Sequence, residues 1–599
     1  MSEKSNKENI RWKTEDLYRT DRAWQNARKK LVRDLPQIKR YKGKLRAKPS
    51  ILACLKLCTD FEKELDRLTC YANRCHDQDT RAGSYQAIKA ISEKVEAEVN
   101  EAMAFIEPEL LALPAKTLRP LIGHKDFTDY DQFLKDLLRQ KKHFRNADEE
   151  ALLAAAAIMA DSGHSAHSTL LAADLKFPKV KNEKGKTERL TLATWPRLRA
   201  SSNRSVRKEA FDTFFDTFSG YQNTLANLLN AQVNANLFNA RAHNYPTVLS
   251  ASLDDDAIPE SVYHQLIKAA NQNLPILHRY LDFRRRRLKI KKLRYTDLYA
   301  PIINRADLKF PYEKGCSILV DAVSPLGEEY QADLKMALDP KSGWVDPFPG
   351  PGKRSGAYMD GSAYDVHPYV LGNYLGDYDS LSMLAHEMGH AMHSFYSNRK
   401  QPYAKADYSI FVAEVASTLN ELLLARSLAN SAKGRKAQAF ILGEVLENYR
   451  LTFFRQAMFA EFELEMYRRA EANEALTVET LSELYLKIVR KYYGHDKGVT
   501  TISSRYAIEW AYIPHFYYGY YVFQYATGIT AATALAEGIV NEGQKARDKY
   551  IKNLLQAGAS APPLTLLKKA GVDLSTVKPY RVAMGHFAQT LSQVESLLG

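Results

Sequence analysis

Two histidines set one helical turn apart, His386 and His390, constrain this chain more than any other feature. Residues four apart on an α-helix point in directions only ~40° apart, so one ion can bind both imidazoles only if the segment is helical. The pattern H-E-x-x-H on a helix is typical of a Zn²⁺ site. Glu387 lies ~100° around the axis, placed to take a proton from a metal-activated water. The motif predicts a zinc helix with Glu387 as general base and then acid.

A second element must supply a third ligand, because catalytic zinc takes three protein ligands and keeps one open position. Residues 408–421 form the next predicted helix and carry two acids among apolar and small residues. Glu414 is the candidate ligand, since an acid on an apolar helix needs a partner. Glu421 falls on the same face. It is either a group that orients a metal ligand or an ordinary carboxylate at a helix end.

A third histidine, His393, also shares the face of His386. A three-histidine zinc site would need a glycine turn after His390, and residues 391–395 contain none. We therefore expect His393 to support the ligands from behind or to pack against its neighbours.

An aromatic segment near residue 520 carries candidate donors for the oxyanion that forms during amide hydrolysis. Pro514 predicts a helix start there. On such a helix Tyr518, Tyr521 and Tyr525 fall within ~60° of arc, and His515 lies ~60° from the nearest of them. A histidine and phenols on one stripe can donate hydrogen bonds to an oxyanion and to substrate carbonyls. The alternative is an aromatic stripe that only packs.

Residues 293–378 interrupt the helical pattern directly before the zinc helix, and they predict short strands at 357–358 and 369–371. An exposed strand edge binds an extended peptide through main-chain hydrogen bonds, and 366–374 is the candidate edge. The loop 352–358 is a candidate flap over substrate. The alternative is a small sheet with turns. The candidate substrate-binding residues of this segment are Arg354, Gly356, Ala357, Tyr358, Tyr369 and Gly372.

The chain resembles the M3 family of zinc metallopeptidases, on its oligoendopeptidase F branch, with thimet oligopeptidase as a more distant relative. The resemblance includes the zinc helix and the position of Glu414, and it implies one Zn²⁺ per chain held by His386, His390 and Glu414. It extends over nearly the whole chain through the segments 12–17, 352–358, 454–463, 513–518, 525–528 and 566–573.

The resemblance also implies that a histidine and tyrosines of the aromatic segment stabilise the transition state. His515 carries over directly, but the register of the tyrosines is ambiguous. Tyr521 is the first choice, followed by Tyr525 and Tyr518. The branch often has a tyrosine where this chain has Phe523; if that hydroxyl is the catalytic one in relatives, its role here must be shared by a neighbour or weakened.

Most of the remaining sequence predicts helix, because apolar residues recur at three-and-four spacing. The predicted helices are 21–34, 50–76, 83–112, 130–145, 147–162, 204–240, 259–290 and a series from 407 to the end. Residues 175–192 instead predict a β-hairpin, which separates an N-terminal helical region (1–199) from a catalytic region (200–599). The resemblance implies a mainly α, elongated, neurolysin-like fold with a deep substrate channel and a small β-sheet near the zinc helix.

The composition of the chain indicates which binding partners and which cellular location to expect. The net charge is +14, from 84 basic and 70 acidic residues, but no nucleic-acid recognition motif accompanies the basic runs. We interpret these runs as solvated helix faces and expect no specific nucleic-acid partner. The polar first residues and the short apolar run 152–160 predict no signal peptide and no membrane segment. Five cysteines without C-x-x-C spacing suit a reducing, cytoplasmic location.

These observations predict a zinc-dependent endopeptidase whose partners are short peptides. The oligomeric state, monomer or small homo-oligomer, stays open. One alternative is a dipeptidyl or carboxypeptidase mode, for which Arg354 could anchor a peptide terminus. Another is a peptide-binding or scavenging protein, against which the intact Glu387 argues because binding alone needs no base.

Overall fold

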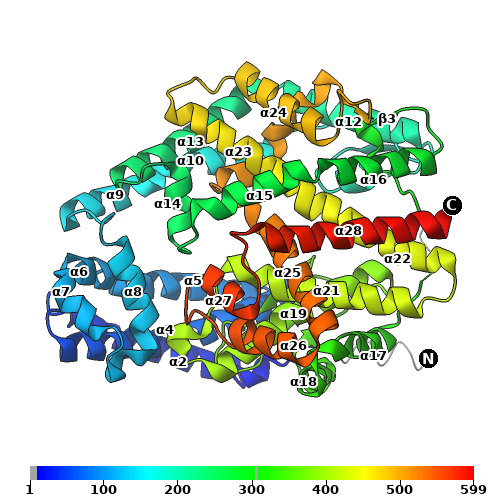
Figure 1. Ribbon diagram of the computed structural model, residues 1–599. Helices are drawn as coiled ribbons and strands as arrows, with labels where there is room; N and C mark the ends of the chain where they lie inside the picture. The colour runs from blue at the N-terminus through cyan, green and yellow to red at the C-terminus, as the bar shows by residue number, and fades with distance from the viewer. Residues whose placement is uncertain (1–9, 304–307) are drawn as a thin grey trace. The chain divides into compact units, whose positions relative to one another are not determined.

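The computed structural model describes residues 10–303 and 308–599, and helices make up most of it (Figure 1). The predicted mainly α class is confirmed. The chain forms two compact units, each assembled from three segments. Unit 1 contains Met1–Ala147, Asp307–Leu428 and Ala531–Asp573, and unit 2 contains Asp148–Ala306, Ala429–Thr530 and Leu574–Gly599. Residue 199, the predicted boundary, lies inside unit 2.

The helices of unit 1 are α2 (Asp21–Asp34), α3 (Pro36–Lys39), α4 (Lys48–Gln78), α5 (Gly83–Met103), α6 (Ile106–Ala112), α7 (Ala115–Leu118), α8 (Asp131–Gln140), α17 (Tyr312–Ala322), α18 (Glu328–Leu338), α19 (Tyr378–Lys400), α20 (Tyr403–Ala406), α26 (Gln544–Tyr550) and α27 (Pro563–Ala570). Almost all of α21 (Ile410–Ser431) also belongs to it. Helix α25 (Phe523–Glu542) begins in unit 2 and ends in unit 1.

The helices of unit 2 are α9 (Ala147–Ala160), α10 (Ser162–Thr169), α11 (Trp195–Arg199), α12 (Arg204–Ser219), α13 (Gln222–Ala242), α14 (Val248–Asp254), α15 (Glu260–Gln272), α16 (Leu274–Arg287), α22 (Arg435–Asn448), α23 (Arg455–Glu471), α24 (Val478–Tyr492) and α28 (Val577–Leu598). Two 3₁₀ segments, Ser504–Tyr512 and Pro514–Tyr517, lead into the aromatic segment. In the part of the chain that the structure describes, no helix is long and apolar enough to span a membrane.

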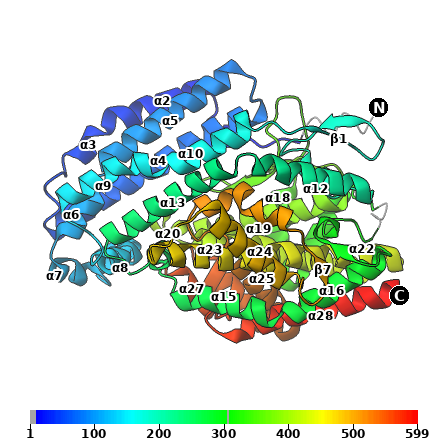
Figure 2. The same ribbon diagram turned by 90° about the horizontal axis from the view of Figure 1, so that it is seen from above.

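The first helices show how local signals set boundaries. Helix α2 begins after Thr20, whose hydroxyl accepts a hydrogen bond from the Ala23 backbone, and it matches the predicted helix 21–34. Helices α4 and α5 then run side by side (Figures 1 and 2) and enclose a core that includes Trp24. The indole nitrogen of Trp24 donates to the carbonyl oxygen of Leu68, so the buried ring leaves no polar atom unsatisfied.

The predicted hairpin is confirmed. Strands β1 (Lys179–Lys181) and β2 (Thr187–Arg189) are antiparallel, with Lys179 opposite Arg189. The Asn182 side chain accepts hydrogen bonds from the backbone of Lys184 and Lys186 and closes the turn. Gly185 adopts φ +73°, a conformation that glycine reaches at little cost.

A three-stranded sheet lies beside the zinc helix in unit 1, as predicted, and its strand order is β4–β6–β5. Strands β5 (Tyr358–Asp360) and β6 (Tyr369–Leu371) confirm the two predicted strands, and β4 is Val345–Asp346. The candidate edge at 366–374 is wrong, because β6 is central and pairs on both sides. Among the strands that the structure describes, β5 pairs only with β6, and its other edge lies beside the helix that carries the histidines. Two further helices, α17 and α18, occupy part of the segment 293–378, where the sequence analysis predicted only short strands.

Candidate active site

The zinc motif lies in the middle of α19, as predicted. The helix begins after Asp377, whose side chain accepts a hydrogen bond from the Ser380 backbone. His386 and His390 point the same way, and their Nε2 atoms are 3.2 Å apart. One turn of helix therefore brings two imidazole nitrogens to a single point.

A glycine inside the motif lets the second helix approach. A Cβ atom on Gly389 would lie 2.5 Å from the Cα of Ser417 and 2.7 Å from the carbonyl oxygen of Ala416, both on α21. Only glycine fits this contact without a shift of one helix. The close approach brings the carboxylate of Glu414 beside the histidines: its Oε2 is 3.4 Å from Nε2 of His386 and 3.8 Å from Nε2 of His390.

The three side chains fit Zn²⁺. Bonds of about 2.0–2.1 Å at tetrahedral angles separate neighbouring ligand atoms by roughly 3.3 Å. The ligand atoms of His386, His390 and Glu414 all lie within 4.8 Å of one another, close to that spacing. Two imidazoles and a carboxylate are also the ligand set of many catalytic zinc sites. Three protein ligands would leave the fourth position of a tetrahedral ion to water or substrate.

Three hydrogen bonds to carboxylates orient the candidate ligands. Oε1 of Glu421 is 2.5 Å from Nδ1 of His386, which leaves Nε2 of that ring available to a metal ion. The Ser382 hydroxyl donates to the other oxygen of Glu421. The Ser417 hydroxyl donates to Oε2 of Glu414 at 3.2 Å. Sequence reasoning missed both serines, although Ser417 lies three residues after Glu414 and so on the same helix face.

Glu387 is 8% exposed and lies next to the ligands in sequence. Burial raises the pKa of its carboxyl to about 7; the charge of His386 lowers this pKa, and the charges of Glu414 and Glu421 raise it. A carboxylate whose pKa lies near neutrality can both accept and return a proton. This is the property that the predicted role of Glu387 requires.

His393 is fully buried and its ring stacks on Tyr408, with centroids 3.6 Å apart and planes at 10°. The Tyr408 hydroxyl forms a hydrogen bond with the Ser394 hydroxyl at 2.8 Å. Of the two alternatives from the sequence, packing describes His393 best. The residue supports the back of α19 rather than the ligand face.

The aromatic segment of unit 2 does not form the predicted helix from Pro514 to Tyr525. A 3₁₀ turn covers Pro514–Tyr517, and α25 starts only at Phe523. Between them Gly519 and Tyr520 have φ values of +61° and +55°, which no α-helix allows. The prediction of one continuous helix is wrong, because two consecutive residues with left-handed backbone conformation interrupt it.

The turn nevertheless gathers the predicted side chains. The ring centroid of His515 lies 5.7 Å from that of Tyr518, 6.1 Å from Tyr521 and 5.9 Å from Tyr525. Burial lowers the pKa of His515, so its ring is neutral at pH 7 and keeps one N–H to donate. Phe523, in contrast, is buried with its ring against Tyr263.

Glu463 stabilises this turn through a hydrogen bond to its backbone. It is fully buried and one carboxyl oxygen accepts a hydrogen bond from the Tyr520 backbone at 2.6 Å. The Tyr520 ring packs against Tyr263 and stacks on Tyr467. These contacts compensate the left-handed backbone of Tyr520, which costs about 1–3 kcal/mol at a non-glycine residue.

We expect Glu463 to make stability depend on pH. Burial raises its pKa from 4.5 to about 8, so between these values the folded protein holds a proton that the unfolded chain releases. Stability from this group is complete below pH 4.5 and is lost as the pH rises through about 8. Glu463→Gln cannot ionise, so its melting temperature should fall less than that of the wild type between pH 5 and pH 8. Glu465→Gln, on the same helix but more exposed, is the control and should follow the wild type.

The N-terminal helix α4 fixes strand β5 through a buried polar network. Arg74 is paired with Asp360, and its guanidinium lies over the ring of Tyr358. The Tyr358 hydroxyl donates to Asp77, and the Arg354 guanidinium lies 3.2 Å from the same carboxylate. The side chains of Tyr358 and Arg354 therefore tie the strand to α4.

The remaining candidate substrate-binding residues divide into two groups. Tyr369 is fully buried and donates its hydroxyl proton to the Lys13 carbonyl, and the Gly372 amide donates to the carbonyl of Asp346. Both belong to the central strand or its end and offer no free edge. Gly356 and Ala357 precede β5, where backbone groups can meet an extended peptide.

Gly389 gives a direct test of the helix contact. We expect Gly389→Ala to lower stability by about 1–3 kcal/mol, because the new methyl group overlaps the α21 backbone. Affinity for zinc should fall together with stability, since the two helices carry the candidate ligands. Gly585→Ala is the matched control: this helical glycine of α28 has no atom within 4 Å of its Cβ position. The free energy of unfolding of Gly585→Ala should rise by up to about 1 kcal/mol, because alanine favours the helix over glycine. Equal melting temperatures for Gly389→Ala and wild type would contradict the close packing.

Comparisons with known proteins fit this geometry. The family model described as Peptidase family M3 matches residues 197–586, and that of Oligopeptidase F matches residues 109–177. Oligopeptidase PepF of Bacillus subtilis is 38% identical over 589 residues, which cover 98% of this chain and 87% of that protein. A crystal structure from Chlamydophila abortus has a TM-score of 0.92 at 33% identity and covers 98% of both chains. Oligoendopeptidase-F from Enterococcus faecium has a TM-score of 0.74 at 31% identity, covering 96% of this chain and 99% of its own.

Proposed function

This chain belongs to peptidase family M3 and is a metallopeptidase of the oligoendopeptidase F type, and from that premise we propose that it is a zinc-dependent endopeptidase that hydrolyses internal bonds of short peptides. The observation that carries the proposal is the meeting of His386, His390 and Glu414 at one point, with Glu387 on the same helix. One Zn²⁺ per chain would be held by these three ligands.

A bound Zn²⁺ supplies Lewis acidity, which polarises the scissile carbonyl and acidifies water. The protein's own groups move the proton. Glu387 takes a proton from the attacking water and then gives it to the nitrogen of the leaving amine. Its buried carboxyl, with a pKa near 7, suits both steps. Glu421 holds the His386 ring in the orientation that presents Nε2.

His515 and the tyrosines around it are proposed to stabilise the oxyanion. Neutral N–H and O–H donors act there without a proton transfer. We expect His515→Ala to lower kcat by about 10²–10³-fold with little change in KM, and Tyr521→Phe to have the next largest effect. Tyr525 and Tyr518 follow. Steady-state kinetics on one peptide would check this order, with Tyr517→Phe as the control because that ring packs on His167. A raised KM with unchanged kcat would assign His515 to binding instead.

Substrate is proposed to lie along the free edge of β5, near Gly356 and Ala357. Main-chain pairing at an edge binds peptides of many sequences. The exopeptidase alternative needs a charged group for a peptide terminus, and Arg354, its candidate, is paired with Asp77. That pairing favours internal cleavage.

The test is hydrolysis of an internally quenched peptide of about ten residues with both ends blocked, a length that spans roughly 33 Å when extended. Cleavage of an internal bond supports the endopeptidase. Cleavage only after a terminus is unblocked would favour an exopeptidase, and binding without cleavage a scavenging protein. Preference for short peptides predicts slow cleavage of a denatured protein and fast cleavage of its fragments.

The cytoplasm remains the predicted location. All five cysteines are free thiols, as a reducing compartment requires. Some arginines of the basic runs form ion pairs within the protein: Arg284 pairs with Glu447, and Arg286 pairs with Glu595. This pairing supports the interpretation that charge alone implies no nucleic-acid partner.

A further inference from the structure

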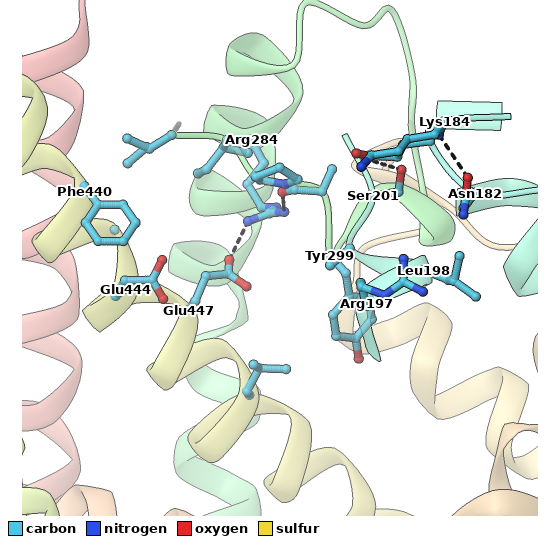
Figure 3. Close-up of a pocket in the computed structure, with 18 of the residues that line it drawn as sticks. Asn182, Lys184, Arg197, Leu198, Ser201, Arg284, Tyr299, Phe440, Glu444 and Glu447 are labelled. Carbon is cyan, nitrogen blue, oxygen red and sulfur yellow. Dashed lines mark hydrogen bonds and ion pairs between the residues drawn. The ribbon is translucent and has the colours of Figure 1, made fainter. Parts of the chain in front are cut away.

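Unit 2 contains two features that the proposed function does not use, a cavity and helix α10. The cavity has a volume of about 980 Å³ and lies between the β1–β2 hairpin, the loop 299–303 and α22 (Figure 3). Within its lining Arg284 pairs with Glu447 (Figure 3), so these two charges balance each other. Helix α10, in contrast, contacts the aromatic segment at the turn that carries His515.

A glycine sets the position of α10 in unit 2. A Cβ atom on Gly163 would lie 2.9 Å from the carbonyl oxygen of Leu228 and 3.3 Å from the backbone nitrogen of Gln232, both on α13. The two helices therefore pack backbone to backbone at this point. His167 follows one turn later on the same face of α10, and it is 0% exposed. The packing against α13 thus determines where the His167 ring lies.

The ring of His167 contacts the aromatic segment on both sides of His515. Its Nε2 atom lies 3.1 Å from the carbonyl oxygen of Ala511, which precedes His515. Its ring stacks on that of Tyr517, which follows His515, with centroids 4.3 Å apart and planes at 23°. One buried side chain of α10 therefore holds both ends of the turn that presents His515.

The hydrogen bond also fixes the protonation of the His167 ring. Burial lowers its pKa more than the Ala511 carbonyl raises it, so the ring is neutral at pH 7 and has one N–H. A carbonyl oxygen only accepts, so Nε2 carries the proton. Nδ1 is then a buried acceptor, and among the described residues it has no hydrogen-bond partner. An unpaired buried acceptor costs stability, so packing alone does not account for a histidine at this position.

His164, also on α10, contacts the end of the same turn. Its ring lies edge-on to that of Tyr518, with centroids 5.2 Å apart. The Tyr518 ring lies edge-on to His515 as well, at 5.7 Å. Nδ1 of His164 is 3.3 Å from Oδ1 of Asp161, directly before the helix. The half-exposed Tyr518 ring is therefore held between two histidines.

We propose that His167 is a positioning residue for His515: its hydrogen bond to Ala511 and its stack on Tyr517 hold the turn so that the His515 N–H meets the oxyanion. The inference rests on the proposed function, in which His515 donates to the oxyanion. Such a donor stabilises a transition state only if it is aligned before the charge develops. Misplacement of a catalytic group by about 1 Å can lower a rate by about 10²-fold. His167 is buried and acts through the backbone of the turn.

Steady-state kinetics of His167→Phe on the end-blocked quenched peptide tests the proposal. Phenylalanine keeps a ring to stack on Tyr517 but has no N–H for the Ala511 carbonyl. We expect kcat to fall by about tenfold or more with KM nearly unchanged, the usual size of such an indirect effect. His167→Gln retains an N–H donor without the stacked ring and should recover part of the loss.

The same substitution in a His515→Ala background separates positioning from general destabilisation. If His167 acts through His515, His167→Phe should lower kcat no further once the His515 ring is absent. Its effect on the melting temperature should be the same in both backgrounds. His278→Phe is the matched control, because this half-buried histidine of α16 also bonds to a carbonyl oxygen, that of Tyr492, at 3.0 Å. It should lower the melting temperature and leave kcat unchanged.

Two results would overturn the positioning role: a wild-type kcat in His167→Phe, or a loss of kcat that persists in full in the His515→Ala background. If His167→Phe does not fold, Tyr517→Leu removes the stack from the other partner and should show the same dependence on His515. Failure of the proposed function would look different, because His515→Ala itself would then keep the wild-type kcat. A lowered kcat in His515→Ala with no effect of either His167→Phe or Tyr517→Leu would reject the positioning role alone.

Discussion

Glu387→Gln is expected to lower kcat/KM for an end-blocked peptide by about 10²–10⁴-fold, the usual contribution of a general base. The amide keeps the size of the side chain but can neither accept the proton of water nor return it to the leaving amine. The three proposed zinc ligands are unchanged, so zinc content should remain at the wild-type level. Kinetics on a quenched peptide together with metal analysis of the same samples measure both quantities.

The matched control is Glu329→Gln, the same chemical change at an exposed glutamate of α18. It should leave both the rate and the zinc content unchanged. A Glu387→Gln protein that retains more than a tenth of the wild-type rate would show that another group carries the proton. If zinc were lost together with the rate, Glu387 would act on the metal rather than on the water.

Loss of the metal should lower peptidase activity at least as much as Glu387→Gln does. His390→Ala removes one of the three proposed ligands, and we expect zinc content and activity both to fall to background, because two ligands hold Zn²⁺ weakly. A chelator should produce the same loss in the wild type, and added Zn²⁺ should restore the wild type but not the variant. Metal analysis and peptide hydrolysis after gel filtration report the two losses separately.

His264→Ala is the control for this experiment, since this histidine is exposed on α15 in unit 2. Its zinc content and rate should match those of the wild type. Full activity in a metal-free wild type would exclude the proposed mechanism outright. Zinc content and activity retained in His390→Ala would instead mean that His386 and Glu414 suffice to hold the metal, and the ligand assignment would need revision.

The cluster of His386, His390 and Glu414 could be predicted from the sequence because its geometry is mostly local. The spacing of His386 and His390 fixes their common direction once the segment is helical. Glu414 required one more inference, that a second helix packs against the first. Gly389 lies within the motif, but the sequence alone could not predict that it allows the close approach of α21, because that contact is made by the tertiary fold.

The strand order of the sheet and the backbone conformation of the aromatic turn could not be predicted from the sequence. Strand order depends on pairing between segments far apart, so β6 and β5 looked equally suited to the edge. The turn at Tyr520 depends on Glu463, which lies 57 residues away in the chain and reaches its backbone. The helical pattern of the aromatic segment was real, but tertiary contacts overrode it.

Helix α4 and strand β5 lie almost three hundred residues apart in the chain, yet Arg74 and Asp77 hold the strand that faces the zinc helix. Unit 1 draws its last segment from Ala531–Asp573. During synthesis the N-terminal helices must therefore wait for most of the polypeptide before their unit is complete. At about 5–20 residues per second, that wait lasts tens of seconds. Unit 1, which carries the proposed zinc site, is therefore complete only after residue 573 has been synthesised.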